Sequence, residues 1–380
     1  MTLNARTASL AALGQSLWLD NMRRGMLLGE LQQLRDELSV TGLTANPTIF
    51  EKAIAGSADY DEALALLARD PACSAEAAYE RLALSDIQRA ADLFRPVHER
   101  TKGQDGFISL EVSPELARDT AGTLAEVRRF WTELDRPNVL IKIPGTAEGV
   151  PAIRDALTLG INVNVTLLFS ISQYEAVAQA HLAAMEARIA QGLPVDRVAS
   201  VASFFVSRVD TLVNKLIDRA VEQKKPEAKE LSALRGRIGI ANSKLAYQKY
   251  LELTQSPRWK AVAARGARPQ RVLWASTSSK DPKERDVRYV EALAGPDTVN
   301  TMPPETLAAF ADHGEAKALL TSDLPAAREE LARLERAGLS LEALCGDLQR
   351  EGVSKFIDSI VALRKAIGTK LERFRREGPR

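Results

Sequence analysis

The chain has few of the residues and segments that mark secreted or membrane-spanning proteins. Its 380 residues include only two cysteines, Cys73 and Cys345, which are too few and too far apart for a disulfide framework. No apolar run is long enough to span a membrane, and no basic stretch leading into an apolar signal core follows Met1. We therefore expect a cytoplasmic protein without a membrane partner.

Charge and histidine content argue against a nucleic-acid-binding protein and against a zinc protein. The 51 basic and 50 acidic residues leave a formal net charge of +1, so no overall field attracts nucleic acid, although a local phosphate site stays open. The three histidines, His98, His181 and His313, are isolated and match no zinc-binding spacing. We expect neither a nucleic-acid partner nor a metal site.

Short strand-like segments recur along the chain, and most are separated by stretches with helical periodicity. The eight segments cover residues 16–20, 40–46, 106–112, 139–143, 161–167, 198–203, 271–276 and 298–302. This alternation of strands and helices predicts an α/β protein with a closed (β/α)8 TIM barrel. The alternative is a doubly wound open sheet. The segment after the first strand, DNMRRG, is not the Gly-rich turn of a dinucleotide-binding sheet, which favours the barrel.

The remaining segments read as helices added to the barrel. The connections at 47–105 and 208–270 are long enough for several helices each, and the chain beyond residue 313 shows only helical patterns. We predict a barrel catalytic domain at residues 1–313 and, in the same domain, C-terminal helices at 314–380 that pack on the barrel or flank it. The expected helices include residues 75–100, 324–337 and 339–367.

Lys142 is the most informative residue of the chain, because it interrupts NVLIKIPG, a segment that otherwise reads as a buried parallel strand. Strand alternation places Lys142 on the face opposite Ile141 and Ile143. A buried ammonium is costly without a partner or a function, so the lysine predicts amine chemistry. The alternative is a structural lysine that reaches water or pairs with a carboxylate.

The same alternation places further polar side chains inside the barrel, near the carboxyl ends of its strands. These are Asp20, Thr44, Asn46, Ser109, Glu111, Asn162, Asn164, Thr166, Ser203 and Ser276. The alternative interpretation is a satisfied polar network that only stabilises the barrel. An amine beside carboxylates can instead attack a ketone, form a Schiff base and use it as an electron sink for C–C cleavage. Carboxylates close to Lys142 favour its ammonium form, so desolvation or an intervening water has to offset them.

Six segments closely resemble signature segments of the transaldolase family, in the same order along the chain. They are VTGLTANPT at 40–48, SLEVS at 109–113, LIKIP at 140–144, GINVNVTLLFS at 160–170, SFFVSR at 203–208 and LWAST at 273–277. The resemblance covers residues 17–313 and leaves the tail outside. The length and the last segment look most like the longer bacterial transaldolases. The resemblance implies a cofactor-free (β/α)8 enzyme of the non-oxidative pentose phosphate pathway.

The resemblance also implies a role for each matching residue. Lys142 forms the Schiff base, Asp20 is the acid/base for C–C cleavage, and Glu111 with Thr166 holds a proton-shuttling water. The residues that orient the dihydroxyacetone unit are Thr44, Asn46, Asn164 and Ser203, and the phosphate ligand is Arg208.

One position departs from the family pattern. Many transaldolases have an arginine two residues after the serine of strand seven, but here Ser278 follows Ser276, and Lys280 is the nearest cation. Either Lys280 substitutes for that arginine, or Ser276 and backbone amides bind the phosphate on this side.

The expected activity is transfer of a dihydroxyacetone unit from sedoheptulose 7-phosphate or fructose 6-phosphate to glyceraldehyde 3-phosphate or erythrose 4-phosphate. One alternative is a lyase like fructose-6-phosphate aldolase, which would share Lys142 and release free dihydroxyacetone. The other is a non-catalytic sugar-phosphate-binding barrel, which the combination of Asp20, Glu111 and Lys142 disfavours. The expected assembly is a monomer or a homodimer.

Overall fold

The computed structural model describes residues 3–279 and 281–377. Within this part of the chain eight parallel strands form a closed barrel, in which each strand pairs with the next and β8 pairs with β1. The strands are β1 (Gln15–Leu19), β2 (Val40–Thr44), β3 (Ile108–Glu111), β4 (Val139–Pro144), β5 (Val163–Leu168), β6 (Ser200–Phe205), β7 (Arg271–Ala275) and β8 (Thr298–Met302). The predicted (β/α)8 barrel is confirmed.

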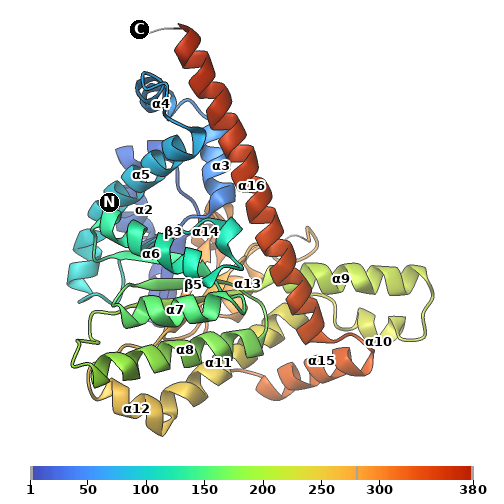
Figure 1. The fold of residues 1–380 in the computed structure, drawn as a ribbon. Coiled ribbons are helices and arrows are strands. Elements are labelled where there is room, and N and C mark those ends of the chain that lie inside the picture. Colours follow the sequence, from blue (N-terminus) through green and yellow to red (C-terminus); the bar gives the residue numbers. More distant parts are fainter. Residues whose placement is uncertain (1–2, 280, 378–380) are drawn as a thin grey trace.

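Helices surround this barrel, and several connections contain more than one (Figure 1). Those of the first half are α1 (Ala5–Ala12), α2 (Glu30–Leu38), α3 (Pro47–Ala55), α4 (Asp61–Leu67), α5 (Ala75–Arg100), α6 (Thr120–Leu134), α7 (Gly149–Thr158) and the 3-10 helices η1 (Arg24–Leu28) and η2 (Pro114–Leu116). Those of the second half are α8 (Ile171–Ala190), α9 (Ser207–Glu222), α10 (Ala228–Ser232), α11 (Ile238–Gln255), α12 (Pro257–Ala263), α13 (Arg288–Ala292), α14 (Pro304–His313), α15 (Leu324–Arg336) and α16 (Leu341–Glu377).

Side-chain alternation along the strands separates two hydrophobic layers. Leu17, Ile141 and Ile143 belong to the large cluster between the barrel and its helices. Trp18 and Leu140, which have the opposite parity, belong to a second cluster, which includes the barrel interior and continues into α9, α15 and α16. Gly42 makes room for the indole, because a Cβ at this position would lie 2.7 Å from Trp18 Cε2. The Trp18 indole therefore packs inside the barrel, against β2.

The alternation fails at one position in the fifth strand. The sequence predicts Leu167 on the outer face with Val163 and Val165, but its φ is +60°, and the pairing with β6 shifts between Val165 and Leu168. The left-handed backbone turns the Leu167 side chain into the second cluster, towards Gly352 of α16. The predicted facing of Leu167 is therefore wrong.

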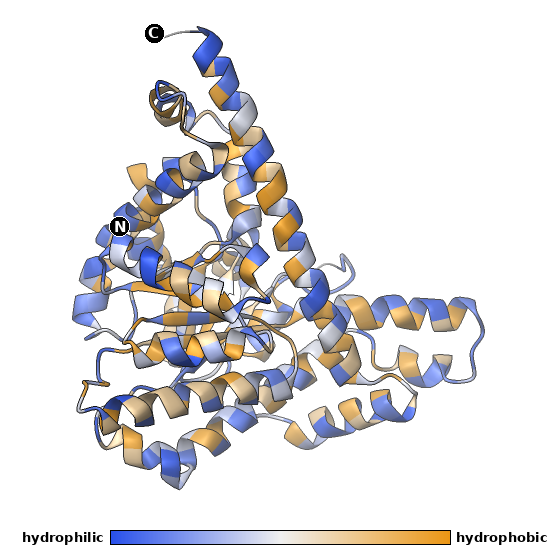
Figure 2. Cartoon of the chain, in the orientation of Figure 1, coloured by the Kyte–Doolittle hydropathy of each residue, from blue (hydrophilic) through white to orange (hydrophobic). Residues whose placement is uncertain are grey.

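The C-terminal helix α16 runs diagonally across the barrel and continues past α4 (Figure 1). It packs against α3, α4, α5, α9 and β5. Hydrophobic and hydrophilic residues alternate along its length (Figure 2), as expected for a helix that buries one face. The two helices predicted for the tail are confirmed, although α16 is longer than expected.

Candidate active site

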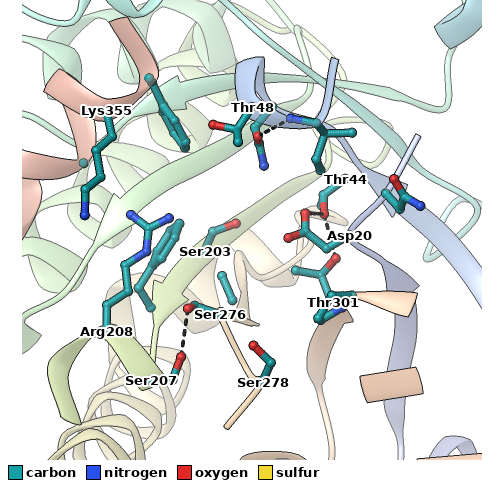
Figure 3. A pocket seen from close by; sticks show the side chains of 18 of the residues that line it. Asp20, Thr44, Thr48, Ser203, Ser207, Arg208, Ser276, Ser278, Thr301 and Lys355 are labelled. Atoms are coloured by element: carbon teal, nitrogen blue, oxygen red, sulfur yellow. Dashed lines mark hydrogen bonds between the residues drawn. The ribbon is translucent and has the colours of Figure 1, made fainter. Parts of the chain in front are cut away.

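A cavity of about 740 Å³ opens at the carboxyl ends of the strands. Its lining comes from both the barrel and the C-terminal helix. The strand ends and the loops after them supply Asp20, Thr44, Asn46, Lys142, Ser203, Ser276, Ser278 and Thr301; α9 supplies Ser207, Arg208 and Lys215; and α16 supplies Leu348, Glu351, Gly352, Lys355 and Phe356. Figure 3 shows Asp20, Thr44 and Thr301 grouped on one side of this cavity and Arg208 with Lys355 on the other.

Lys142 lies at the floor of the cavity in a row of three polar residues. Strand pairing aligns Glu111 with Lys142 and Lys142 with Asn164, so their side chains share the inner face. The Lys142 side chain is only 5% exposed, and its Nζ lies 3.4 Å from Glu111 Oε2. The Nζ also donates to the Ala45 carbonyl at 3.4 Å. The amine is buried beside a carboxylate, with its tip reaching the cavity.

Glu111 is a buried carboxyl that can exchange protons near neutral pH. Burial raises the pKa of Glu111 to about 7, against the opposing effect of Lys142. Neither carboxylate oxygen accepts a well-aligned hydrogen bond from a described residue, and the buried Thr166 Oγ1 is also unpartnered. Such groups need a polar partner from solvent or substrate, which suits the proton-transfer roles expected for both residues.

Asp20 lies across the cavity, at the end of β1. Thr44 Oγ1 donates to Asp20 Oδ1 at 2.7 Å and is 2.7 Å from Thr301 Oγ1 (Figure 3). Burial raises the pKa of Asp20, while Lys142 and Thr44 act in the opposite direction. The two threonines fix the orientation of the carboxyl group, and the free oxygen can act as an acid or a base.

Two of the predicted substrate-orienting amides have other partners in the structure. Asn164 is fully buried; its Nδ2 donates to Ser109 Oγ at 3.0 Å, and its Oδ1 accepts from Ser203 Oγ at 2.7 Å. Asn46 caps α3, because its Oδ1 accepts from the Ile49 amide at 3.1 Å. Asn46 lines the cavity, whereas Asn164 acts from below it by holding Ser203.

Arg208 occupies the first turn of α9 and stacks on Phe205, with 4.8 Å from the guanidinium carbon to the ring centre. Within residues 3–279 and 281–377 its guanidinium makes no hydrogen bond or ion pair. Next to it, Ser207 Oγ and Ser276 Oγ are 2.9 Å apart, and Ser276 has a positive φ of 57°. A fork of unused donors at a helix N-terminus is a suitable partner for an anion.

Two residues bear on the position after strand seven that departs from the family pattern, and the structure describes only Ser278. Ser278 is buried and lines the cavity, so it can offer a hydroxyl but no charge. Lys280 lies outside the described residues. The sequence reasoning missed Thr301 and the residues of α16. Alternation along β8 is the signal that could have found Thr301, because it shares the inner face with Val299.

Two kinds of feature are absent from the described residues, a metal-binding cluster and a membrane-spanning helix. Across the described residues, no group of three or more histidine, cysteine or acidic side chains is arranged to hold a metal ion. In the same part of the chain, no helix is both long and apolar enough to cross a membrane.

Comparison with known proteins agrees with this geometry. The family model described as Transaldolase/Fructose-6-phosphate aldolase matches residues 17–367. A transaldolase of Thiobacillus denitrificans is 47% identical over 363 residues, which cover 95% of this chain and 99% of that protein. A transaldolase of Saccharopolyspora erythraea is 45% identical over 374 residues, which cover 98% and 99%.

The match extends beyond residue 313, where the predicted resemblance ends, and therefore includes most of α16. The chain belongs to the transaldolase family.

Proposed function

We propose that this chain is a transaldolase that transfers a dihydroxyacetone unit through a Schiff base on Lys142. The observation that carries the proposal is the buried amine at the cavity floor, with Glu111 Oε2 at 3.4 Å and Asp20 across the same cavity. Lys142 attacks the ketone carbon of the donor, and loss of water from the carbinolamine gives a cationic imine. The imine withdraws electrons from the bond that is to be cleaved.

Glu111 and Asp20 carry out different proton transfers in this mechanism. Glu111, with a pKa of about 7, exchanges protons through a water held with Thr166 while the carbinolamine forms and loses water. Asp20 removes the proton from the donor hydroxyl, and cleavage of the C–C bond then releases the aldose phosphate. The enamine left on Lys142 adds to the aldehyde of the acceptor, and hydrolysis of the new imine frees the product.

The remaining site residues bind the substrate. Thr44, Asn46 and Ser203 hold the dihydroxyacetone unit, with Ser203 oriented by Asn164. Arg208 binds the phosphate, supported by Ser276 and the N-terminus of α9, which no described side chain caps. The proposal extends to donors such as fructose 6-phosphate and sedoheptulose 7-phosphate, with glyceraldehyde 3-phosphate or erythrose 4-phosphate as acceptor.

We also propose a domain organisation, a cellular compartment and an oligomeric state for this enzyme. The barrel of residues 1–313 and the C-terminal helices form one domain, supported by the packing of α16 against α3, α5 and β5. The enzyme works in the cytoplasm as a monomer or homodimer, and size-exclusion chromatography distinguishes these two assemblies.

Borohydride reduction tests the mechanism. In the presence of fructose 6-phosphate, reduction should attach a dihydroxyacetone-derived group to Lys142, and Lys142→Ala should lose both the label and turnover. Mass spectrometry of the digested protein identifies the labelled residue. A label on a different lysine contradicts the assignment.

A fructose-6-phosphate aldolase-like lyase is the second candidate, since the family model covers both activities. With fructose 6-phosphate alone, a transaldolase should stop at the adduct, and adding erythrose 4-phosphate should release sedoheptulose 7-phosphate. Accumulation of dihydroxyacetone at a comparable rate without acceptor would favour the lyase.

A further inference from the structure

The C-terminal helix is fixed to the rim of the cavity by hydrogen bonds at both edges. Gln349 Nε2 donates to the carbonyls of Gly145 (2.9 Å) and Leu167 (3.0 Å), at the ends of β4 and β5. Ten residues further along, Ser359 Oγ is 2.7 Å from Thr48 Oγ1, on α3. These hydrogen bonds therefore hold the stretch of α16 between Gln349 and Ser359 in a fixed position across the cavity.

Gly352 brings this stretch close to Arg208. A Cβ at position 352 would lie 2.8 Å from Leu167 Cδ2 and 3.7 Å from Arg208 Nη1, so a larger residue would require Leu167 or the helix to shift. Lys355 follows Gly352 by three residues and thus shares its helix face, one turn further along. Figure 3 shows the Lys355 ammonium and the Arg208 guanidinium pointing toward one another.

Charge balance indicates that Arg208 needs a second cation. A phosphate monoester carries close to two negative charges at neutral pH, and Arg208 supplies only one positive charge. Besides Arg208 and Lys355, four other cations among the described residues line the cavity. Lys142 is committed to the chemistry, and Arg23 pairs with Glu30. Lys52 lies on α3, which follows β2, four strands around the barrel from β6 and therefore on the side opposite Arg208. Lys215 lies seven residues from Arg208 on α9, which is about 10 Å along the helix.

We infer that Lys355 is a second phosphate ligand, which α16 carries over the cavity to act together with Arg208 and to set the preference for phosphorylated donors. The inference rests on the proposed transaldolase function. Glu351 Oε1 is 2.5 Å from Lys355 Nζ and also lines the cavity. This carboxylate neutralises the ammonium when no phosphate is bound, and the phosphate takes over the lysine when it binds.

Lys355 and Glu351 should therefore act in opposite directions. The Lys355 side chain is 62% exposed, so its contribution is screened, and Lys355→Gln should lower kcat/KM for fructose 6-phosphate by roughly twofold to fivefold. Glu351→Gln should raise kcat/KM for this donor, because it frees the lysine and removes a negative charge. Neither change should alter kcat/KM for unphosphorylated fructose.

Lys365→Gln is the matched control, because it removes the same charge from an exposed position of α16 about 15 Å further along the helix. Calorimetric titration with inorganic phosphate provides a readout that does not depend on turnover. Weaker phosphate binding in Lys355→Gln than in Lys365→Gln supports the inference. Equal binding and equal donor preference in these two variants overturn it.

The two proposals fail separately. A wild-type protein that forms no borohydride-trapped adduct contradicts the proposed function, whereas the phosphate titration still tests Lys355. An active wild-type enzyme whose Lys355→Gln variant keeps the full preference for phosphorylated donors contradicts only the role of Lys355. Trapping with fructose in each variant checks that the Lys142 site is still folded.

Discussion

The raised pKa of Glu111 predicts that the rate of Schiff-base formation falls as the pH drops below neutrality, which is the acid limb of its pH profile. An ordinary glutamate with a pKa near 4.5 stays ionised at pH 5.5, but Glu111 with a pKa of about 7 is ionised to only about 3% there. If the ionised carboxylate is the base, the rate of adduct formation should fall about thirtyfold between its plateau above pH 8 and pH 5.5. The midpoint should lie near pH 7.

Glu111→Gln separates this limb from other titrations. The variant keeps the shape of the side chain and cannot accept the proton, so adduct formation should slow by about 10²- to 10⁴-fold and lose the inflection near pH 7. The donor phosphate also titrates near pH 6, but it does so equally in both proteins. The assay is single-turnover trapping with borohydride, which follows adduct formation without requiring later steps.

Neighbouring charges should move the midpoint in opposite directions. The Asp20 carboxylate raises the pKa of Glu111, whereas the Arg208 guanidinium lowers it. Asp20→Asn should therefore shift the midpoint to lower pH, and Arg208→Ala should shift it to higher pH. An inflection that persists near pH 7 in Glu111→Gln would show that the limb belongs to another group and would refute the reasoning.

Two buried groups away from the cavity predict opposite dependences of stability on pH. Burial raises the pKa of Asp210 to about 6, although Asp210 accepts hydrogen bonds from the Gly239 amide and the Tyr289 hydroxyl. Between these pKa values the folded state holds a proton that the unfolded state releases. The free energy of unfolding should therefore fall by about 3 kcal/mol as the pH rises from 3.8 to 6. The Asp210→Asn variant should not show this loss. Burial lowers the pKa of His181 to about 4, and here the unfolded state takes up the proton first. Stability should thus fall by about 3 kcal/mol as the pH drops from 6.5 to 4, and His181→Phe should remove that loss while keeping the stacking on Trp259. Denaturant unfolding as a function of pH measures both effects; parallel curves for a variant and the wild type would contradict the corresponding prediction.

The row of Glu111, Lys142 and Asn164 could be predicted from the sequence because it follows from side-chain alternation and from the pairing of neighbouring strands. Alternation assigns Glu111, Lys142 and Asn164 to one face of their strands, and parallel pairing of neighbouring strands aligns them. Alternation does not predict how far each side chain reaches towards the cavity. Lysine is long enough to reach the cavity, while the shorter Asn164 stays below it and bonds to Ser109 and Ser203.

The contribution of α16 could not be predicted from its sequence. Gln349, Gly352 and Lys355 come more than 130 residues after Arg208 in the sequence, and their pattern indicates only an amphipathic helix. Their role depends on where the helix crosses the barrel, which tertiary packing decides. The positive φ of Leu167 has the same origin, because the side chain packs under that helix.

The order of the strands around the barrel explains why Asp20, Lys142 and Arg208 all line one cavity. Asp20 follows β1, Lys142 lies on β4, and Arg208 follows β6, so steps of three, two and three strands separate them around the closed barrel. This nearly even spacing directs the three side chains towards the centre of the mouth from different sides. In the proposed mechanism, the ketone meets the Lys142 amine while the donor hydroxyl faces Asp20 and the phosphate faces Arg208. Helix α16 adds Glu351, Gly352 and Lys355 to the lining of the same cavity, and we propose that Lys355 adds its charge there to that of Arg208.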